Sequence, residues 1–347
     1  MHVSRSTFGH LLDFVDRFPG YFLGCNAALP RIGGSVLAHD HYQGGGELLP
    51  MHKAAAWATM TLPEYPDATI EILDWPGTAV RVVAKSRDTI IEVCDRSAEL
   101  DQLLQPRAGH HLRRRGRQAL RGVAQRDHHR ARLRMSLIFR NNSVSEELPE
   151  GIFHAHPEFW PVKQEPIGLI EAQGLFILPG RLINQLGLIE DALAEGKPLP
   201  EEVGEFTLEW DELTATLNGE RDRDAIHAAV QDELGSVCER ILGNTAVFKH
   251  KELTRDSWKA SDSILSIRIL LESSTAVFQG GTHDYHSGNG RRGLHRYAHR
   301  CRAAEQGVRR CLRGQTTATR RPRRSIASRR SPARPSSATR AMSAMRR

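Results

Sequence analysis

Two histidines and a glutamine occupy alternate positions in a glycine-rich segment: His39, His41 and Gln43. On an extended strand, residues two apart point to the same face, so these three side chains would lie side by side. The flanking glycines allow backbone N–H groups to approach a phosphate without a Cβ in the way. A neutral imidazole is a nucleophile near neutral pH, and a neighbouring amide can donate to a non-bridging phosphate oxygen. The pattern therefore favours nucleotidyl transfer through a covalent histidine intermediate.

The same spacing also fits a metal site or a purely structural role. The two imidazoles could ligate a metal ion, or they could be packed side chains at the edge of a core. Asp40 points to the other face of the strand, which makes a metal triad with it geometrically awkward. Cys25, not far away in the chain, is more typical of packing than of a ligand. On the residues alone, all three interpretations stay open.

The elements that would position these residues are strands followed by helices, which predicts an α+β fold. Runs rich in alternating or β-branched apolar residues predict strands over 21–24, 33–38, 69–72, 80–82, 89–94, 136–139 and 167–179. Helical apolar spacing predicts helices over 5–15, through the region after Gly180, best over 221–242, and over 254–265. The three glycines 44–46 predict a tight turn or a close backbone approach.

Composition excludes several classes of protein. The chain has 347 residues, 48 Lys and Arg against 41 Asp and Glu, and a formal charge of +7. No apolar run is long enough to span a membrane, and the first residues lack the apolar stretch of a signal peptide. The five cysteines are odd in number and have no C-x-x-C spacing, which fits a reducing cytoplasm. We therefore expect a cytoplasmic protein with no membrane partner.

The positive charge is concentrated in two stretches that contain no lysine. Residues 105–134 hold ten Arg and residues 291–347 hold eighteen, whereas the rest of the chain is net acidic. Disordered basic segments would have this composition. So would translation in the wrong frame of GC-rich DNA, which yields Arg, Ala, Gly and Pro and avoids Lys. The absence of lysine favours the wrong frame, which predicts that strands beside 136–139 are lost and leave an unpaired sheet edge.

Three blocks carry a family resemblance, and they occur in the right order. The first is FPGYFLGCNAALPRIGGSVLAHDHYQGG at 18–45. The second is GIFHAHPEFW at 151–160, followed by VKQEPIGLIEAQGLFILPGRL at 162–182, and the third is ILGNTAVFK at 241–249. Together they resemble the second bacterial class of galactose-1-phosphate uridylyltransferases, over residues 1–102 and about 135–265.

That resemblance implies a fold and a domain organisation. The family belongs to the histidine-triad superfamily, and its subunit has two related halves, each an antiparallel sheet with helices. Residues 1–65 would be the C-terminal remnant of the first half, with the nucleophile motif, and residues 66–265 the second half, interrupted by the Arg-rich stretch 103–134. Residues 266–347 would be an Arg-rich disordered tail. The chain would then be a truncated and frame-damaged copy that lacks most of the first half.

The resemblance also implies a reaction and its partners. His41 would attack the α-phosphorus of UDP-glucose and hold a uridylyl group, which galactose 1-phosphate then takes, and Gln43 matches the phosphate-binding glutamine. Family members work as dimers, so a homodimer is implied, and no nucleic-acid partner is expected. The alternatives are an inactive fragment of that enzyme, another histidine-triad nucleotide hydrolase or phosphorylase, or a basic protein that binds nucleic acid through its Arg stretches.

Further site residues follow from the resemblance alone. Asn26 and Ser35 match positions that bind phosphates or nucleotide in the related class, and His39 matches a zinc ligand there. The other zinc ligands would lie in the missing part, so no metal residue is assigned. His154 and His156 form a second histidine pair, expected on one face of a strand, which resembles part of a second metal site.

Lys163 and Glu171 are the nearest matches to the residues that contact the hexose phosphate and the sugar. Their spacing to Gly168 differs from the family pattern by one residue, and Glu171 could equally be a structural surface charge.

Overall fold

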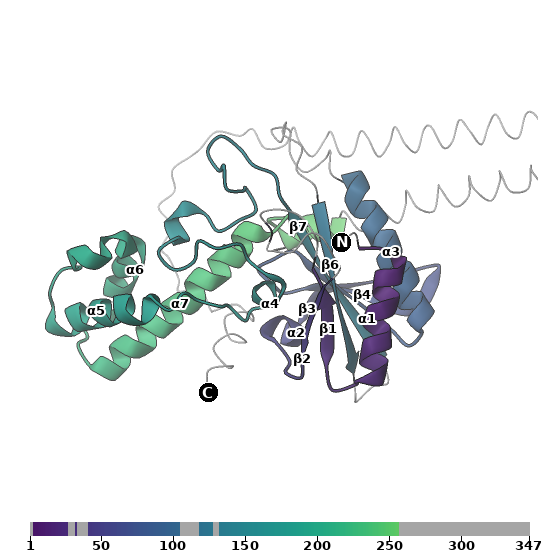
Figure 1. The fold of residues 1–347 in the computed structure, drawn as a ribbon, viewed down its shortest axis with the longest axis horizontal. Coiled ribbons are helices and arrows are strands. Elements are labelled where there is room, and N and C mark those ends of the chain that lie inside the picture. Colours follow the sequence, from purple (N-terminus) through teal and green to yellow (C-terminus); the bar gives the residue numbers. More distant parts are fainter. Residues whose placement is uncertain (1–2, 27–31, 33–40, 105–117, 128–131, 257–347) are drawn as a thin grey trace, which may run out of the picture. The chain divides into compact units, whose positions relative to one another are not determined.

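The computed structural model describes residues 3–26, 32, 41–104, 118–127 and 132–256 (Figure 1). Several predictions lie outside these residues: Ser35, His39, the strand over 33–38, the tail 266–347 and most of the helix over 254–265. Residues 251–256 are helical, which agrees with the start of that last prediction.

A seven-stranded sheet organises the described residues, and every neighbouring pair of its strands is antiparallel. Its order is β2-β1-β6-β7-β5-β4-β3. The strands are β1 (Phe22–Cys25), β2 (Tyr42–Gly45), β3 (Ala56–Leu62), β4 (Tyr65–Leu73), β5 (Ala79–Ala84), β6 (Gln118–Asp127) and β7 (Arg132–Asn141). With helices on both faces, the protein has the predicted α+β class.

Helices α1 (Arg5–Arg17) and α3 (Arg87–Leu104) cover one face of the sheet (Figure 1). The helix predicted over 5–15 is confirmed as α1, and the apolar stripe formed by Phe8, Leu11, Leu12 and Val15 is fully buried. Strand β6 lies directly beneath it, because a Cβ on Gly122 would come within 3.1 Å of Leu11 and 3.2 Å of Phe8.

Strand β6 corrects the prediction of an unpaired edge. Residues 118–127 belong to the Arg-rich stretch, yet they pair with all ten residues of β7 in unbroken register. The ladder is made by backbone groups, which arginine supplies as well as any other residue. At the centre of the strand, Gly122, Val123 and Ala124 are small enough to be buried between two layers.

Two apolar runs predicted as strands are wrong. Residues 89–94 belong to helix α3, where Ile90, Val93 and Cys94 are buried with helical spacing and Ser86 Oγ accepts from the Thr89 amide. Residues 167–179 form the short helix α4 (Leu169–Ala172) and irregular backbone, because Gly174, with a φ of +100°, turns the chain. Ile167 and Leu169 are buried in the core, whereas Leu175 and Ile177 are exposed.

The region after Gly180 is helical, as predicted: α5 (Leu182–Glu195), η2 (Glu201–Phe206), α6 (Thr207–Leu217) and α7 (Arg223–Thr245). In α7 the predicted stripe is buried, including Ile226, Val230 and Ile241, and the helix ends two residues beyond the expected stop at Gly243. The C-terminal end of α7 joins the same core cluster as Leu73 and Trp75 at the end of β4.

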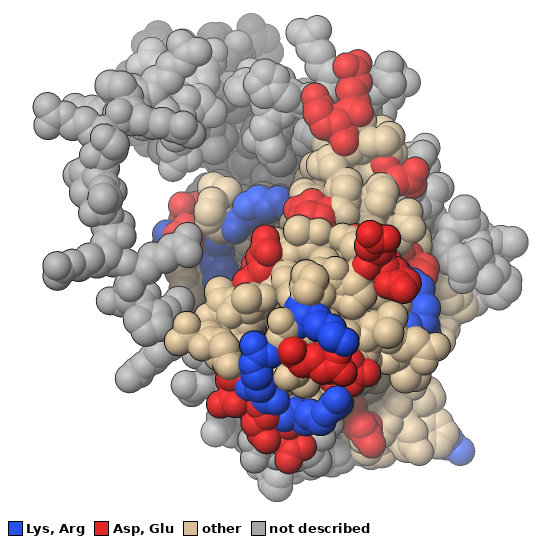
Figure 2. Space-filling model, turned by 90° about the vertical axis from the view of Figure 1, so that its left-hand side faces the viewer, with Lys and Arg blue, Asp and Glu red and all other residues tan. Residues whose placement is uncertain are grey.

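Charged side chains of both signs alternate over the surface drawn in Figure 2. Ion pairs on the helices include the exposed pair of Arg223 with Asp191 at 2.8 Å and the half-buried pair of Arg240 with Glu212 at 2.6 Å. This described surface is therefore mixed in charge and not a basic patch. Among the described helices, none combines the length and apolar character needed to cross a membrane.

Candidate functional site

Asn26, His41 and Gln43 meet at the end of the β1–β2 hairpin where β1 ends and β2 begins. The hairpin register places Gly24 opposite Gln43 and Cys25 opposite Tyr42, so Asn26 and His41 follow as the next two residues. Asn26 Nδ2 lies 2.8 Å from Gln43 Oε1 and 3.3 Å from His41 Nε2. Asn26 is buried, whereas His41 is half-buried and Gln43 is exposed. One buried amide thus organises two accessible side chains.

The hydrogen bonds of Asn26 define the tautomer of His41. An amide nitrogen only donates, so His41 Nε2 accepts and carries a lone pair, which places the proton of the neutral ring on Nδ1. Gln43 accepts through its oxygen, which leaves its NH₂ group to donate to another acceptor. The buried Asn26 Oδ1 has no hydrogen-bond partner among the described residues. The cluster therefore offers a nucleophilic nitrogen, an amide donor and a spare acceptor.

Gly44 explains why this hairpin needs glycine. A Cβ at residue 44 would lie 2.4 Å from the carbonyl oxygen of Phe22, closer than real Cβ contacts. The close backbone approach predicted for the glycines is therefore present between β1 and β2. It brings the ends of the two strands near enough for Asn26 to reach both partners.

The site face of the sheet, opposite α1 and α3, carries this cluster. Residues directly opposite each other in an antiparallel pair lie on the same face. One row of such pairs crosses all seven strands: Gln43, Gly24, Val123, Ser136, Arg81, Glu71 and Thr59. A Cβ on Gly24 would come within 2.8 Å of Leu169 Cδ2, so helix α4 packs on this face beside the cluster.

Lys163 and Glu171 are brought to each other. Both are buried, and Lys163 Nζ lies 3.0 Å from Glu171 Oε1 and donates to the Ile177 carbonyl at 3.0 Å. Glu171 also accepts from the Gly168 amide at 2.8 Å and from the Ile177 amide at 3.1 Å. The pair thus holds the loop around α4 together. Because Leu169 belongs to α4, this loop lies against the same face of the sheet as His41.

The second histidine pair does not lie on a strand, which corrects that prediction. Residues 151–156 form turns and bends before the short helix η1 (Pro157–Phe159). His154 Nδ1 is 3.0 Å from the Ala155 carbonyl oxygen, and His156 Nε2 is 3.0 Å from that of Ile152. Each ring contacts a different backbone oxygen. The segment is not extended, because the chain turns at Gly151, which has a φ of +142°.

In the part of the chain that the structure describes, no group of three or more His, Cys, Asp or Glu side chains gathers as a metal site. His39, the residue matched to a zinc ligand, lies outside that part. The described cysteines Cys25, Cys94 and Cys238 are buried and form no disulfide.

Two buried arginines were missed by the sequence reasoning. Arg121 on β6 and Arg140 on β7 have almost no exposed surface, and both donate to the Ile167 carbonyl just before α4. Burial lowers the pKa of Arg121 to about 10 and the pKa of Arg140 well below its usual value. Single arginines give no periodic signal, so only the register of β6 against β7 reveals the pair.

A buried histidine, His52, was also missed. It lies in the short helix α2 (Pro50–Lys53), and its Nε2 is 2.6 Å from Oε1 of Gln173, immediately after α4. Burial lowers the pKa of His52 to about 4, so the ring is neutral at physiological pH. The two residues are far apart in the chain, and no local pattern connects them.

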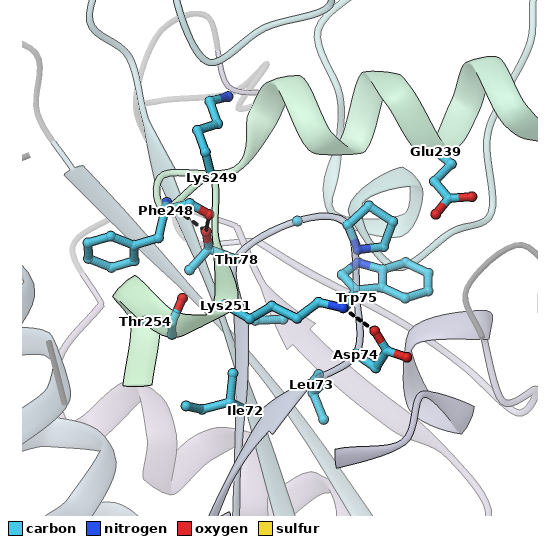
Figure 3. Close-up of a pocket in the computed structure, with 13 residues that line it drawn as sticks. Ile72, Leu73, Asp74, Trp75, Thr78, Glu239, Phe248, Lys249, Lys251 and Thr254 are labelled. Atoms are coloured by element: carbon cyan, nitrogen blue, oxygen red, sulfur yellow. Dashed lines mark hydrogen bonds and ion pairs between the residues drawn. The ribbon is translucent and has the colours of Figure 1, made fainter. Parts of the chain in front are cut away.

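A small pocket of about 180 Å³ lies elsewhere, between the β4–β5 turn and the segment after α7 (Figure 3). Trp75, Thr78 and Phe248 line it, and Lys251 reaches across to form an ion pair with Asp74. None of the predicted site residues lines this pocket. The cluster at Asn26, not the pocket, is therefore the candidate site.

Comparison with known proteins shows which family this chain resembles. The chain is 68% identical over 262 residues to a galactose-1-phosphate uridylyltransferase of Bifidobacterium longum, which covers 74% of this chain and 50% of the relative. This chain is a partial homologue of the galactose-1-phosphate uridylyltransferases. Enzymes of the same name from Ligilactobacillus salivarius and Enterococcus faecalis are 32% and 35% identical, over 75% of this chain and 52% of each relative.

The chain spans about half the length of the uridylyltransferases that it matches. No family model matches it, and no solved structure matches it.

Proposed function

We propose that this chain transfers a uridylyl group from UDP-glucose to galactose 1-phosphate through a covalent intermediate on His41. The observation that carries the proposal is the contact between Asn26 and His41, which keeps Nε2 unprotonated in a half-buried side chain. The Nε2 lone pair accepts from Asn26 in this structure and exchanges that donor for phosphorus when it attacks. Homology to enzymes named for this activity supports the choice of reaction.

In the first half of the reaction, His41 Nε2 attacks the α-phosphorus of UDP-glucose. A P–N bond forms and the P–O bond to the β-phosphate breaks, so that glucose 1-phosphate leaves with the bonding electron pair. This leaving group is already ionised at neutral pH and needs no strong general acid. The Gln43 NH₂ group donates to a non-bridging oxygen on which negative charge grows.

In the second half, a phosphate oxygen of galactose 1-phosphate attacks the same phosphorus. The P–N bond breaks, its electron pair returns to Nε2, and UDP-galactose leaves. Substrate contacts for Asn26, Lys163 and Glu171 are part of this proposal, as are those for Ser35 and His39. Support for Lys163 and Glu171 comes from helix α4, which carries Glu171 and packs on the site face of the sheet beside the cluster.

Intact-mass measurement of the purified protein after brief incubation with UDP-glucose tests the proposal. We expect a gain of one uridylyl group in the wild type and none in the His41→Ala variant. Addition of galactose 1-phosphate should then remove the group and release UDP-galactose. A folded protein that gains no group is the inactive fragment, and one that cleaves nucleotides without transfer to the sugar phosphate is a hydrolase.

A cytoplasmic location and a homodimer are further predictions. The described cysteines, which are buried and form no disulfide, are consistent with a reducing compartment. Sedimentation of the purified chain tests the dimer.

A further inference from the structure

His52 and Gln173 connect two segments that are distant in sequence and adjacent on the site face of the sheet. The Leu49 amide donates to His52 Nδ1 at 3.2 Å, so the ring proton lies on Nε2 and is donated to Gln173 Oε1 at 2.6 Å. Gln173 Nε2 in turn donates to the Leu169 carbonyl at 3.1 Å. Every polar atom of the two side chains therefore has one partner, with its donor or acceptor role defined.

Backbone contacts reinforce the same junction. The Met51 amide donates to the Gln173 carbonyl at 3.0 Å, and Trp75 Nε1 donates to the Ala172 carbonyl at 3.1 Å. Next to it, Gly174 allows the chains to approach, because a Cβ there would lie 2.9 Å from both Pro50 and Trp75. Helix α2 and the C-terminal end of α4 are thus in close contact, which limits movement of one relative to the other.

Helix α2 is also attached to the sheet beneath it. Arg81 on β5 donates to the carbonyl oxygens of His52 at 3.2 Å and Ala54 at 3.1 Å, and its Nε donates to Glu71 at 2.7 Å. The His52 ring packs edge-on against Phe22 of β1, with ring centroids 4.9 Å apart. The position of His52 is therefore defined by the strand that leads to Asn26.

Each end of the contact lies close in sequence to a candidate site residue. Strand β2, with Gln43, ends four residues before Leu49, whose amide binds the His52 ring. On the other side, Glu171 precedes Gln173 by two residues in the same turn of chain. A displacement of Gln173 relative to His52 would therefore move Glu171 relative to the hairpin that carries His41.

We propose that His52 and Gln173 are positioning residues that hold the Lys163–Glu171 loop in register with the Asn26–His41–Gln43 cluster. The proposal rests on the proposed function, in which that loop contacts the sugar phosphate. Neither residue touches the reacting atoms. Their effect is expected in the second half of the reaction, which needs both segments, more than in the first, which uses the hairpin itself.

A double variant separates positioning from stability. His52→Leu combined with Gln173→Met removes both partners of the hydrogen bond together. The cost in stability is then that of the Leu49 amide and the Leu169 carbonyl, which lose one side-chain partner each. We expect the KM for galactose 1-phosphate, measured by loss of the uridylyl group from the protein, to rise about tenfold, since small misplacements of binding groups are costly. The rate of uridylylation by UDP-glucose should change by less than about twofold.

Two controls accompany this variant. The single variant His52→Gln, with Gln173 intact, keeps one acceptor and one donor at residue 52. Its KM for galactose 1-phosphate should be close to the wild-type value. Val230→Ala, in the core of α7 away from the sheet, lowers stability without touching the junction and should leave the KM unchanged. An unchanged KM in the double variant, or an equal rise in Val230→Ala, would overturn the proposal.

Amide hydrogen exchange tests the role of His52 and Gln173 without relying on uridylyl transfer. The Ala172 and Gln173 amides are bonded within the α4 turn, to Gly168 and Ile170. In the double variant they should exchange about tenfold faster than in the wild type, because the turn loses its support. If the wild type gains no uridylyl group, the proposed function fails, and unchanged exchange then refutes the coupling as well.

Discussion

Arg121 and Arg140 donate to the same carbonyl oxygen, that of Ile167, at 3.5 and 3.2 Å from two neighbouring strands. Both are fully buried, and each has two further guanidinium nitrogens without a partner among the described residues. The acid that acts on both arginines is Glu171, whose carboxylate is already engaged by Lys163 and two backbone amides. Two like charges thus share a buried site and one acceptor.

This arrangement predicts that Arg121→Met stabilises the protein. A buried cation without a counter-ion pays its desolvation cost uncompensated, and here a second cation adds repulsion. We expect the free energy of unfolding to rise by about 1–3 kcal/mol, measured by urea denaturation. Arg81→Met is the matched control: Arg81 is buried too, but its donors bind Glu71, His52 and Ala54, so its loss should cost about 3 kcal/mol. A destabilised Arg121→Met variant would contradict this account.

Asn26→Asp tests the tautomer of His41. A carboxylate cannot donate a hydrogen bond, so the His41 nitrogen that faces residue 26 would carry the proton. In that tautomer Nε2 has no lone pair with which to attack phosphorus. We expect uridylylation by UDP-glucose to slow by about a hundredfold, in the range seen when one polar catalytic group is removed. Asn142→Asp, beyond the end of β7, is a matched control that should react at the wild-type rate. Equal rates in the two variants would mean that Asn26 does not control His41.

Stability should fall in mild acid because of His52. Its folded-state pKa is about 4 against an ordinary value near 6.5, so the unfolded chain binds more protons between these values. Protonation of His52 therefore leaves the free energy of unfolding unchanged above pH 6.5 and lowers it progressively toward pH 4, by up to about 3 kcal/mol. The cationic groups Arg81, Lys53 and Arg134 act in the same direction as burial, and the hydrogen bond to Gln173 opposes them.

The measurement is the midpoint of urea unfolding at pH 7, 6 and 5, for the wild type and for His52→Gln. The variant cannot protonate at residue 52, and its curve should be flatter over this range. Parallel curves would show that other groups dominate acid unfolding.

Gly44→Ala should disturb the hairpin that carries His41. The new methyl group would meet the Phe22 carbonyl at 2.4 Å, and the backbone on both strands would have to separate. We expect a loss of about 1–3 kcal/mol in the free energy of unfolding. Gly46→Ala is the control, because its nearest neighbour is 3.8 Å away, an ordinary contact. Similar losses in both variants would argue against a close approach at residue 44.

The parts of the fold that could be predicted from the sequence are those with a sustained period. Helices α1 and α7 each bury the apolar residues along one side, so the helical spacing of those residues in the sequence identified them. The run 89–94 misled because Ile90, Val93 and Cys94 satisfy both strand composition and helical spacing, and only the Ser86 cap separates the two. Strand β6 was missed because its small buried residues are surrounded by arginines that carry no apolar period.

The candidate site divides in the same way. Gln43 and His41 could be predicted as neighbours from alternation on a strand, and the register of β1 with β2 adds Asn26 between them. The contacts of His52 and Arg140 depend on which loop covers the sheet, since Gln173 and Ile167 come from a segment far along the chain. Long-range pairs of single polar residues leave no periodic trace in a sequence.

The strand order has a consequence for how this molecule is made. Within the described sheet, the β1–β2 hairpin joins the other strands through β6, which the ribosome delivers only after β3, β4, β5 and α3. Until then one side of β1 has exposed amides and carbonyls, and pairing them requires closure of a long loop. The hairpin that carries His41 should therefore be among the last parts to gain exchange protection during refolding, and its docking depends on the Arg-rich stretch that supplies its neighbour.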